Sequence, residues 1–185
     1  MKLSEFDYFL PKELIAQHPL KNRDSSRLMV LERKTSRIEH RTFSDITDYL
    51  DSSSLLVLNN TKVLPCRLFG SKTTGGKVEL LLLGRKEAGV FRSLIKPARL
   101  KVGDKINFSA KLHAFVSAKD EVTFNTDDIS LIYKSGVMPL PPYIKREPLD
   151  SDKETYQTVY VTEEGAVASP TAGLHFTKAL LDKIK

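Results

Sequence analysis

The chain has 185 residues, of which 41% are hydrophobic, so it is long enough to bury a core as one larger domain or two small ones. Its single cysteine excludes a disulfide framework and a zinc site built from several thiolates, and we expect a reducing, cytoplasmic location. No apolar run approaches the roughly 20 residues needed to cross a bilayer. The net charge of +6 favours a polyanionic partner without requiring one.

The N-terminal part alternates short helical and β-type segments. Residues 11–16 predict a short helix with proline in its first turn. Residues 27–33 and 37–43 alternate apolar and polar side chains around a polar turn, which predicts a β-hairpin. A helix capped by Ser44 is expected over residues 45–50.

A polar cluster follows the next apolar segment. Residues 54–58 form a continuous apolar run, which is typical of a buried strand. Asn59, Asn60 and Thr61 come at its carboxyl end, where α/β proteins commonly place their sites. The beginning of the chain is therefore predicted to be α/β.

From residue 63 onward, short β-type runs are separated by turns rich in glycine, lysine and aspartate. This spacing predicts a compact antiparallel β-barrel. The expected strands cover residues 63–69, 77–83, 90–95, 105–108, 111–117 and 121–124. A helix capped by Asp127 or Asp128 is expected to follow and to end at Gly136.

The proline-rich segment 138–143 reads as a stiff extended linker that returns the chain from the barrel. We therefore predict the fold class α/β, with a mixed α/β main domain formed by residues 1–62 and 146–185. A small antiparallel β-barrel domain, residues 63–145, is inserted into it.

The C-terminal part predicts a strand over residues 156–161 and a helix from Lys178. Between them, residues 165–173 carry only small side chains, which let the backbone approach another surface and suit a pocket floor. A helix that follows a strand normally leads to another strand, and none is present, so we expect the chain to be part of a longer protein.

Six segments together resemble one known family, the S-adenosylmethionine:tRNA ribosyltransferase-isomerases of queuosine biosynthesis. The resemblance follows the chain in order from its N-terminal part to its last helix, and the predicted barrel is its least distinctive region. The segments are Leu14 to Pro19, Arg23 to Leu31, Leu58 to Leu68, Met138 to Arg146, Tyr156 to Tyr160 and Gly165 to Thr177.

The resemblance implies an enzyme that acts on tRNA carrying 7-aminomethyl-7-deazaguanine at the wobble position. It implies transfer and isomerisation of the ribosyl part of S-adenosylmethionine, giving epoxyqueuosine, adenine and methionine. S-adenosylmethionine is then a consumed cosubstrate, with no further cofactor. Family members continue past Lys185, so some residues of the active site are expected to lie outside this chain.

The reaction proposed for the family needs a base that removes a proton from the ribosyl carbon beside the sulfonium. His175 is the first candidate, because imidazole titrates near neutral pH and small residues surround it. Tyr156 and Tyr160 are the next candidates. His18 lies in another family segment, but Pro19 beside it favours a structural role.

Several hydroxyl and amide side chains are expected to bind the substrate. Thr177 precedes the last helix, whose free amides suit a carboxylate, although a plain helix cap explains it equally well. Asn59, Asn60 and Thr61 suit ribose or adenine, or else a turn stabilised by its own side chains. Ser169 and Thr171 belong to the small-residue loop and complete the set.

The predicted tRNA contacts are basic residues near the family segments. Arg23 and Arg27 suit phosphate, although Asp24 between them offers one an ion pair. The other members lie near the two ends of the predicted insert: Lys62, Arg67, Lys145 and Arg146. The four histidines are too scattered along the sequence to predict a metal site, and no metal is expected.

Two other functions compete with this interpretation. One is a non-catalytic RNA-binding module in which the barrel contacts RNA and the α/β part is a scaffold. Against it, the five phenylalanines of the barrel have a spacing more typical of a core than of a base-stacking surface. The other is a transferase of small molecules that is unrelated to RNA.

Overall fold

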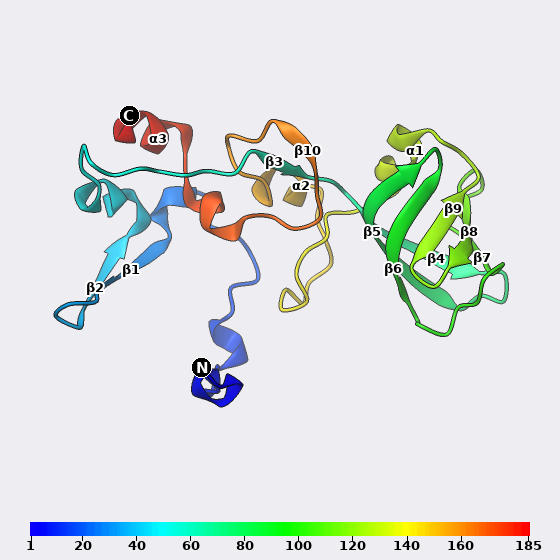
Figure 1. Cartoon of the computed structure of the whole chain (residues 1–185), viewed down its shortest axis with the longest axis horizontal. Helices are drawn as coiled ribbons and strands as arrows, with labels where there is room; N and C mark the ends of the chain where they lie inside the picture. The colour runs from blue at the N-terminus through cyan, green and yellow to red at the C-terminus, as the bar shows by residue number, and fades with distance from the viewer.

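The computed structural model describes all 185 residues (Figure 1). A closed β-barrel lies at one end of the molecule, a β-hairpin lies at the other, and a short parallel strand pair lies between them (Figure 1). This mixed architecture of helices and sheets with an antiparallel barrel confirms the predicted fold class. None of the helices combines the length and apolarity that a bilayer span requires.

Six antiparallel strands form the barrel in the order β4-β5-β6-β9-β8-β7. Alternate side chains of each strand point inward, as the period of a half-buried strand requires, and 13 buried residues form the core there. The barrel strands are β4 Arg67–Lys72, β5 Lys77–Glu87, β6 Val90–Lys96, β7 Lys105–Asn107, β8 His113–Ala118 and β9 Glu121–Phe124. The barrel was therefore predictable from short-range alternation and turn residues.

Helix α1, Ile129–Lys134, closes one end of the barrel through the buried Ile132. Asp128 caps it by accepting hydrogen bonds from the amides of Ser130 and Leu131, as one of the two predicted caps. The chain then returns beside the point where it entered, because Arg67 and Val137 exchange two backbone hydrogen bonds. Gly136 is required there, since a Cβ atom would overlap the carbonyl oxygen of Pro65.

The strand predicted over residues 63–69 is in fact two strands. Strand β3, Thr61–Val63, pairs in parallel with β10, Glu163–Ala166, whereas β4 begins at Arg67 and belongs to the barrel. Pro65 lies between them and lacks the amide that a continuous ladder needs, so the chain changes sheet at this point. The domain boundaries at residues 62/63 and 145/146 stay a prediction.

The predicted hairpin is present as β1, Arg27–Glu32, and β2, Arg37–Thr42. A single 3₁₀-helix, η4 Phe43–Tyr49, follows it and buries Phe43. The predicted cap Ser44 lies inside this helix; the helix is capped instead at Thr42, whose amide donates to the Asp45 carboxylate at 3.0 Å.

The buried strand predicted over residues 54–58 is wrong. The segment is extended but pairs with no other strand, and its side chains are exposed: 87% for Leu55 and 80% for Val57. A strand needs a partner that satisfies its backbone groups, and an apolar run does not specify one. Asn59, Asn60 and Thr61 consequently follow an unpaired segment and lie at the start of β3.

The strand predicted over residues 156–161 is also wrong, because helix α2, Asp152–Thr155, ends at Tyr156 and an irregular turn follows. The Gln157 side chain takes the place of a neighbouring strand. It accepts from the Val63 amide at 3.0 Å and donates to the Val63 carbonyl at 2.6 Å. The pairing strand, β10, therefore comes later, at Glu163–Ala166.

The N-terminal segment, residues 1–22, projects from the body of the molecule (Figure 1). It contains no buried residue, and its only regular elements are the 3₁₀-helices η1, Leu3–Phe6, and η2, Lys12–Leu14. The helix expected over residues 11–16 is thus reduced to a single turn. The segment meets the rest of the chain near a third turn, η3, Arg23–Ser25.

Candidate active site

A cavity of about 370 Å³ lies where the end of the N-terminal segment meets the proline-rich linker, helix α2 and the turn η5, Thr171–His175. This volume is in the range of small-molecule sites. Parts of the chain far apart in sequence line it: residues 16–26, 140–146, 152–156 and 171–175. Five of the six segments that carry the family resemblance therefore contribute residues to one place, and only the segment Leu58 to Leu68 does not.

His175 lines this cavity, and its ring is oriented by Ser26. Nδ1 of His175 lies 3.0 Å from the Ser26 hydroxyl oxygen, and that hydroxyl donates its one hydrogen to the Arg23 carbonyl at 3.0 Å. Because a carbonyl oxygen can only accept, we assign the Ser26 hydrogen to the Arg23 carbonyl and the Nδ1–H of His175 as the donor to Ser26. The other ring nitrogen, Nε2, then carries a free lone pair and can act as a base.

The imidazole is also held by aromatic packing. The Phe43 ring lies with its centroid 5.1 Å from that of His175 and 5.0 Å from that of Phe176. Phe43, Phe176 and Leu180 form a small buried cluster, to which helix α3, Lys178–Ile184, contributes. Phe43, the first residue of η4, thus packs against the imidazole and is itself held by Phe176 and helix α3, which limits the rotation of the ring.

Arg23 joins the cavity walls through main-chain oxygen atoms. Its guanidinium donates to the carbonyls of Gln157 at 2.6 Å, Leu174 at 3.2 Å and Glu154 at 2.7 Å. No carboxylate forms an ion pair with it, and burial lowers its pKa from the usual value. A partly buried positive charge without a counter-ion therefore borders the cavity.

The two candidate tyrosines are placed differently. Tyr156 lines the cavity, but it is 8% exposed and packs with Val63 and Met138. Tyr160 packs against the Phe43 cluster and does not line the cavity. Burial raises the pKa of both phenols, so both hold their protons more firmly at neutral pH than a free tyrosine does.

Of the predicted substrate-binding residues, only Thr171 lines the cavity. Ser169 is buried outside it, and Thr177 caps α3 by accepting from the Leu180 amide while donating to Asp24. The other members lie at the start of β3, where the Asn59 amide donates to Thr61 at 2.8 Å: Asn59, Asn60 and Thr61. The structure does not bring these three to the cavity.

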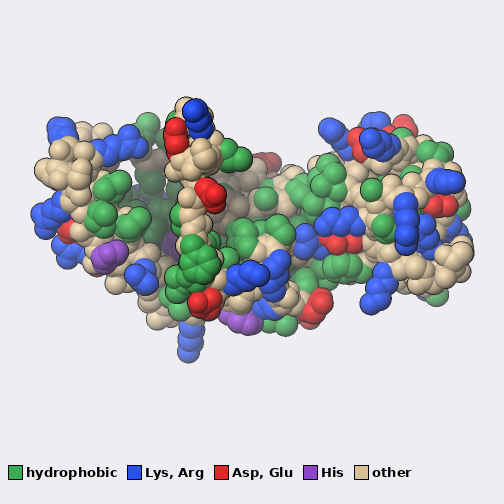
Figure 2. All heavy atoms as spheres, turned by 90° about the horizontal axis from the view of Figure 1, so that it is seen from below, with side chains coloured by type: hydrophobic (Ala, Val, Ile, Leu, Met, Phe, Trp, Pro, Cys, Tyr) green, Lys and Arg blue, Asp and Glu red, His purple; other side chains and the backbone are tan.

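The predicted tRNA contacts divide into engaged and free side chains. Arg23 is engaged by carbonyls, while Lys62 pairs with Glu164, Arg67 with Glu79 and Arg146 with Asp152. Arg27 and Lys145 are exposed, and neither side chain has an ion pair. On the face drawn in Figure 2, lysine and arginine side chains are spread over both ends of the molecule, with acidic side chains among them.

Two groups at the cavity were missed or given too little weight by sequence reasoning. His18 is exposed and lines the cavity, whereas the sequence favoured a packing role. Lys21, also exposed, lines it without an ion pair. The available signals were the place of His18 in the family segment Leu14 to Pro19 and the position of Lys21 two residues before Arg23.

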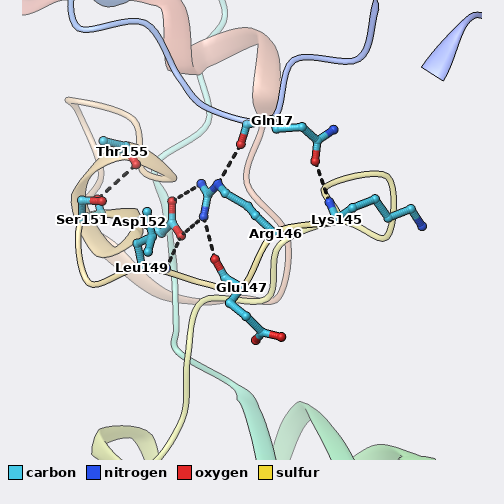
Figure 3. Close-up of polar contacts among 8 residues, drawn as sticks. All are labelled: Gln17, Lys145, Arg146, Glu147, Leu149, Ser151, Asp152 and Thr155. Atoms are coloured by element: carbon cyan, nitrogen blue, oxygen red, sulfur yellow. Dashed lines mark hydrogen bonds and ion pairs between the residues drawn. The ribbon is translucent and has the colours of Figure 1, made fainter. Parts of the chain in front are cut away.

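A buried ion pair between Arg146 and Asp152 supports the part of the cavity wall that these two residues form (Figure 3). The Arg146 guanidinium donates to both carboxylate oxygens of Asp152, at 2.8 Å and 2.7 Å, and the Asp152 side chain is only 2% exposed. Arg146 also donates through Nε to the Gln17 carbonyl at 2.7 Å. Hydrogen bonds from Arg146 lower the pKa of Asp152 and oppose the effect of burial.

Comparison with known proteins assigns the chain to a family. The family model described as Queuosine biosynthesis protein matches residues 3–185, which is nearly the whole chain. The chain belongs to the queuosine biosynthesis protein family. The resemblance inferred from the six segments is thereby confirmed, and three of those segments reach the cavity with at least three residues each.

Curated members of the queuosine biosynthesis protein family are similar to the chain over its full length. The proteins of Thermotoga petrophila and Thermotoga maritima are each 51% identical, and that of a Sulfurihydrogenibium species is 54% identical. All three are named S-adenosylmethionine:tRNA ribosyltransferase-isomerase. The alignments cover 100% of this chain but 56% or 57% of those relatives, so the chain spans little more than half their length.

A solved structure of the family was also found. The crystal structure of an S-adenosylmethionine tRNA ribosyltransferase from Thermotoga maritima is 37% identical over 97% of this chain and 53% of that protein, with a TM-score of 0.38. The assignment to the family rests on the sequence matches.

The remaining reactive groups offer no second catalytic centre. Cys66 is buried in the barrel core, and burial raises the pKa of its thiol to about 11, so it is a poor nucleophile at neutral pH. No group of three or more His, Cys, Asp or Glu residues in the chain is arranged to hold a metal ion.

The Ser26 hydrogen bond generates a first prediction. Replacing Ser26→Ala removes the acceptor of the His175 Nδ1–H, which we expect to shift the tautomer ratio about fivefold toward Nε2–H, for a bond of about 1 kcal/mol. Nitrogen-15 NMR of the ring at about pH 8, where a free imidazole is neutral, measures the ratio. His40 and His113 serve as internal references. An Nε2–H tautomer in the unmodified chain would contradict the assignment.

The Asp152 ion pair generates a second prediction. The pKa of Asp152 is lowered in the folded chain. The ion pair therefore stabilises the fold fully above the unfolded pKa of about 4, and this stabilisation is lost as pH falls through the folded pKa. Asp152→Asn should therefore lower the free energy of unfolding by about 3 kcal/mol at neutral pH, and by progressively less below about pH 4. Urea unfolding across pH measures this.

Asp150→Asn provides the matched control for this substitution. Asp150 also pairs with a cation, Lys153, but its side chain is 96% exposed, so the same change of carboxylate to amide should leave stability unchanged at every pH. A destabilisation by Asp152→Asn that is independent of pH would show that shape and not charge matters at this site.

Proposed function

We propose that this chain carries the ribosyl-transfer site of an S-adenosylmethionine:tRNA ribosyltransferase-isomerase, acting on 7-aminomethyl-7-deazaguanine at the wobble position of tRNA. The single observation that carries the proposal is the cavity lined by His175, whose Nδ1 is engaged by Ser26 while Nε2 has no hydrogen-bond partner in the protein. Membership of the family and the names of its relatives support it. S-adenosylmethionine is the consumed cosubstrate, and no further cofactor, metal or membrane contact is proposed.

His175 is proposed as the base. Its Nε2 takes the proton from the ribosyl carbon next to the sulfonium, and adenine leaves with the electrons of its bond to the sugar. The amine of the deazaguanine then forms a bond to a ribosyl carbon and gives up a proton, and methionine leaves as a neutral thioether with the electron pair of its carbon–sulfur bond. Tyr156 is less suited to accept the first proton, because its buried phenol has a raised pKa, and Tyr160 lies outside the cavity.

The proposed substrate contacts follow the placement of the side chains. Thr171 lies on the cavity wall and is the member of the predicted set best placed to bind the nucleoside. The structure supports a structural role for Thr177, as the cap of α3, and for Ser169, which is buried away from the cavity. We propose substrate contacts at the start of β3 only if the substrate extends along that strand; these residues are Asn59, Asn60 and Thr61.

The tRNA backbone is proposed to contact three cations that have no ion pair: Lys21 on the cavity wall, Lys145 between the lining residues Ile144 and Arg146, and Arg27 on the hairpin. The uncompensated charge of Arg23 adds to the positive potential of this surface. Lys62, Arg67 and Arg146 are held in ion pairs, and we propose that they position the chain instead of binding phosphate. A cytoplasmic location stays a prediction, and no oligomeric state is proposed.

The RNA-binding barrel is the second candidate function, and one observation favours it. Phe69 and Phe115 are 52% and 42% exposed on the barrel, although the sequence had favoured a core role for all five barrel phenylalanines. The cavity at His175 collects both histidines of the family segments, and no barrel residue lines it. Ribosyl transfer therefore remains the better supported function.

Release of adenine tests the proposal. The complete gene product is incubated with S-adenosylmethionine and with tRNA that carries the 7-aminomethyl-7-deazaguanine base, and free adenine is separated by chromatography. We expect adenine only when both are present, and we expect His175→Gln to lower kcat at least about 100-fold with tRNA affinity changed less than about twofold.

Each other outcome assigns a different role to the site. Binding of tRNA without release of adenine supports the RNA-binding module, and turnover of an acceptor other than tRNA supports a small-molecule transferase. Full activity of His175→Gln would remove His175 as the base. His113→Gln is the matched control, because His113 lies on barrel strand β8 and does not line the cavity.

The salt dependence of tRNA binding tests the proposed backbone contacts. Each phosphate contact to single-stranded RNA contributes about 0.7 to the slope of log affinity against log salt concentration. Replacing both Lys21→Gln and Lys145→Gln should therefore reduce that slope by about 1.4 and weaken binding. In the control, Lys111→Gln with Lys119→Gln removes two exposed barrel lysines and should leave the slope unchanged. The reverse result would place the RNA on the barrel.

A further inference from the structure

The N-terminal segment, residues 1–22, is hydrogen-bonded to residues beyond Ser25 only through Gln17. Its other hydrogen bonds are local turns, it forms no ion pair, and none of its residues is buried. The Gln17 carboxamide accepts from the Lys145 amide at 2.6 Å and donates to the Tyr143 carbonyl at 3.2 Å. The Gln17 carbonyl accepts from Arg146. A single residue therefore ties this segment to the linker.

Arg146 is itself fixed on both sides of this tie (Figure 3). Four of its five N–H groups are used: one donates to Gln17, two donate to the Asp152 carboxylate, and one donates to the Glu147 carbonyl. Asp152 also accepts from the Leu149 amide at 2.7 Å, so its carboxylate cannot rotate freely. Because Arg146 has only one N–H group left, it is better suited to hold its neighbours in place than to bind an RNA phosphate.

His18 follows Gln17 directly, and its exposed side chain lines the cavity. No hydrogen bond of its own holds the ring. The position of the ring relative to the cavity is therefore set by the backbone of the preceding residue, whose carbonyl Arg146 holds at 2.7 Å.

We infer that Gln17, Arg146 and Asp152 are positioning residues that place His18 as a second, ligand-facing imidazole on the wall of the cavity that His175 also lines. The role of His18 toward substrate rests on the proposed function, whereas the positioning itself does not. The ion pair between Arg146 and Asp152 fixes the linker, the linker is hydrogen-bonded to Gln17, and Gln17 fixes the backbone that carries His18.

A positioning role and a phosphate contact predict different effects of substitution on tRNA binding. Gln17→Ala and Asp152→Asn remove no positive charge, and Arg146→Lys retains one, so none should weaken tRNA binding through lost charge. All three should release His18 if it is positioned by this network. Lys86→Gln is the matched control, because it removes an ion pair, with Glu121, on the barrel.

The test is NMR of the four histidine rings, labelled with carbon-13, combined with amide hydrogen exchange in the unliganded chain. We expect Gln17→Ala and Arg146→Lys to move the His18 ring resonance and to speed exchange of the Lys145 amide, which donates to the Gln17 carboxamide, at least tenfold. The His40 and His113 resonances should stay unchanged. In the adenine-release assay, the same variants should lower kcat at least tenfold while the KM for tRNA changes less than threefold.

The outcomes separate this inference from the proposed function. An unchanged His18 resonance and unchanged exchange in Gln17→Ala would overturn the positioning, whatever the activity. Movement of His18 with kcat unaffected would overturn its role at the cavity. If Asp152→Asn fails to fold, Gln17→Ala still decides the question, because Gln17 lies at the surface end of the network. Absence of adenine release from the unmodified protein would remove the proposed function and leave the NMR result valid.

Discussion

The contact of the Arg23 guanidinium with three main-chain carbonyls is the interaction on which the candidate site depends. The carbonyls belong to Glu154, Gln157 and Leu174, so one side chain near the N-terminus holds both α2 and the turn that carries His175. The Arg23 carbonyl also fixes the Ser26 hydroxyl, which orients the imidazole. Loss of this side chain would free both the floor of the cavity and its proposed base.

The two arginines at the cavity illustrate two ways of holding a guanidinium. Arg146 is neutralised by a buried carboxylate, and a pair of this kind rigidifies its surroundings while contributing little net charge. Arg23 is bound only by neutral carbonyl oxygens, so its charge persists. Lys21 also lines the cavity, so two positive charges that no ion pair neutralises lie on its wall.

The small residues of the last loop have a physical explanation that differs in part from the predicted one. Gly173 is buried, and a Cβ atom there would overlap the Tyr160 hydroxyl and crowd Thr158. The absence of a side chain therefore serves close packing against an aromatic ring, and it is this packing that brings Leu174 and His175 to the cavity. The prediction that small residues permit close approach was right, but the surface they approach at Gly173 is the protein itself.

The sequence by itself determined the elements that depend on neighbours along the chain. The barrel strands follow from alternation and turn residues, the α1 cap follows from the position of Asp128, and His175 stands out within a recognisable motif. The strands predicted from the sequence over residues 54–58 and 156–161 were wrong, because an apolar or alternating run does not specify which partner satisfies its backbone.

Only the tertiary structure decided which polar groups meet. Ser26 and His175 are 149 positions apart, and Arg23 and Leu174 are 151 apart, yet they are in hydrogen-bond contact. The sequence offered Asp24 as the partner of Arg23 or Arg27, and phosphate as that of Arg146; folding gave Asp24 to Thr177 and Arg146 to Asp152. Charge and residue type are local properties, whereas the partner of a charged group depends on which distant backbone the fold brings within about 3 Å.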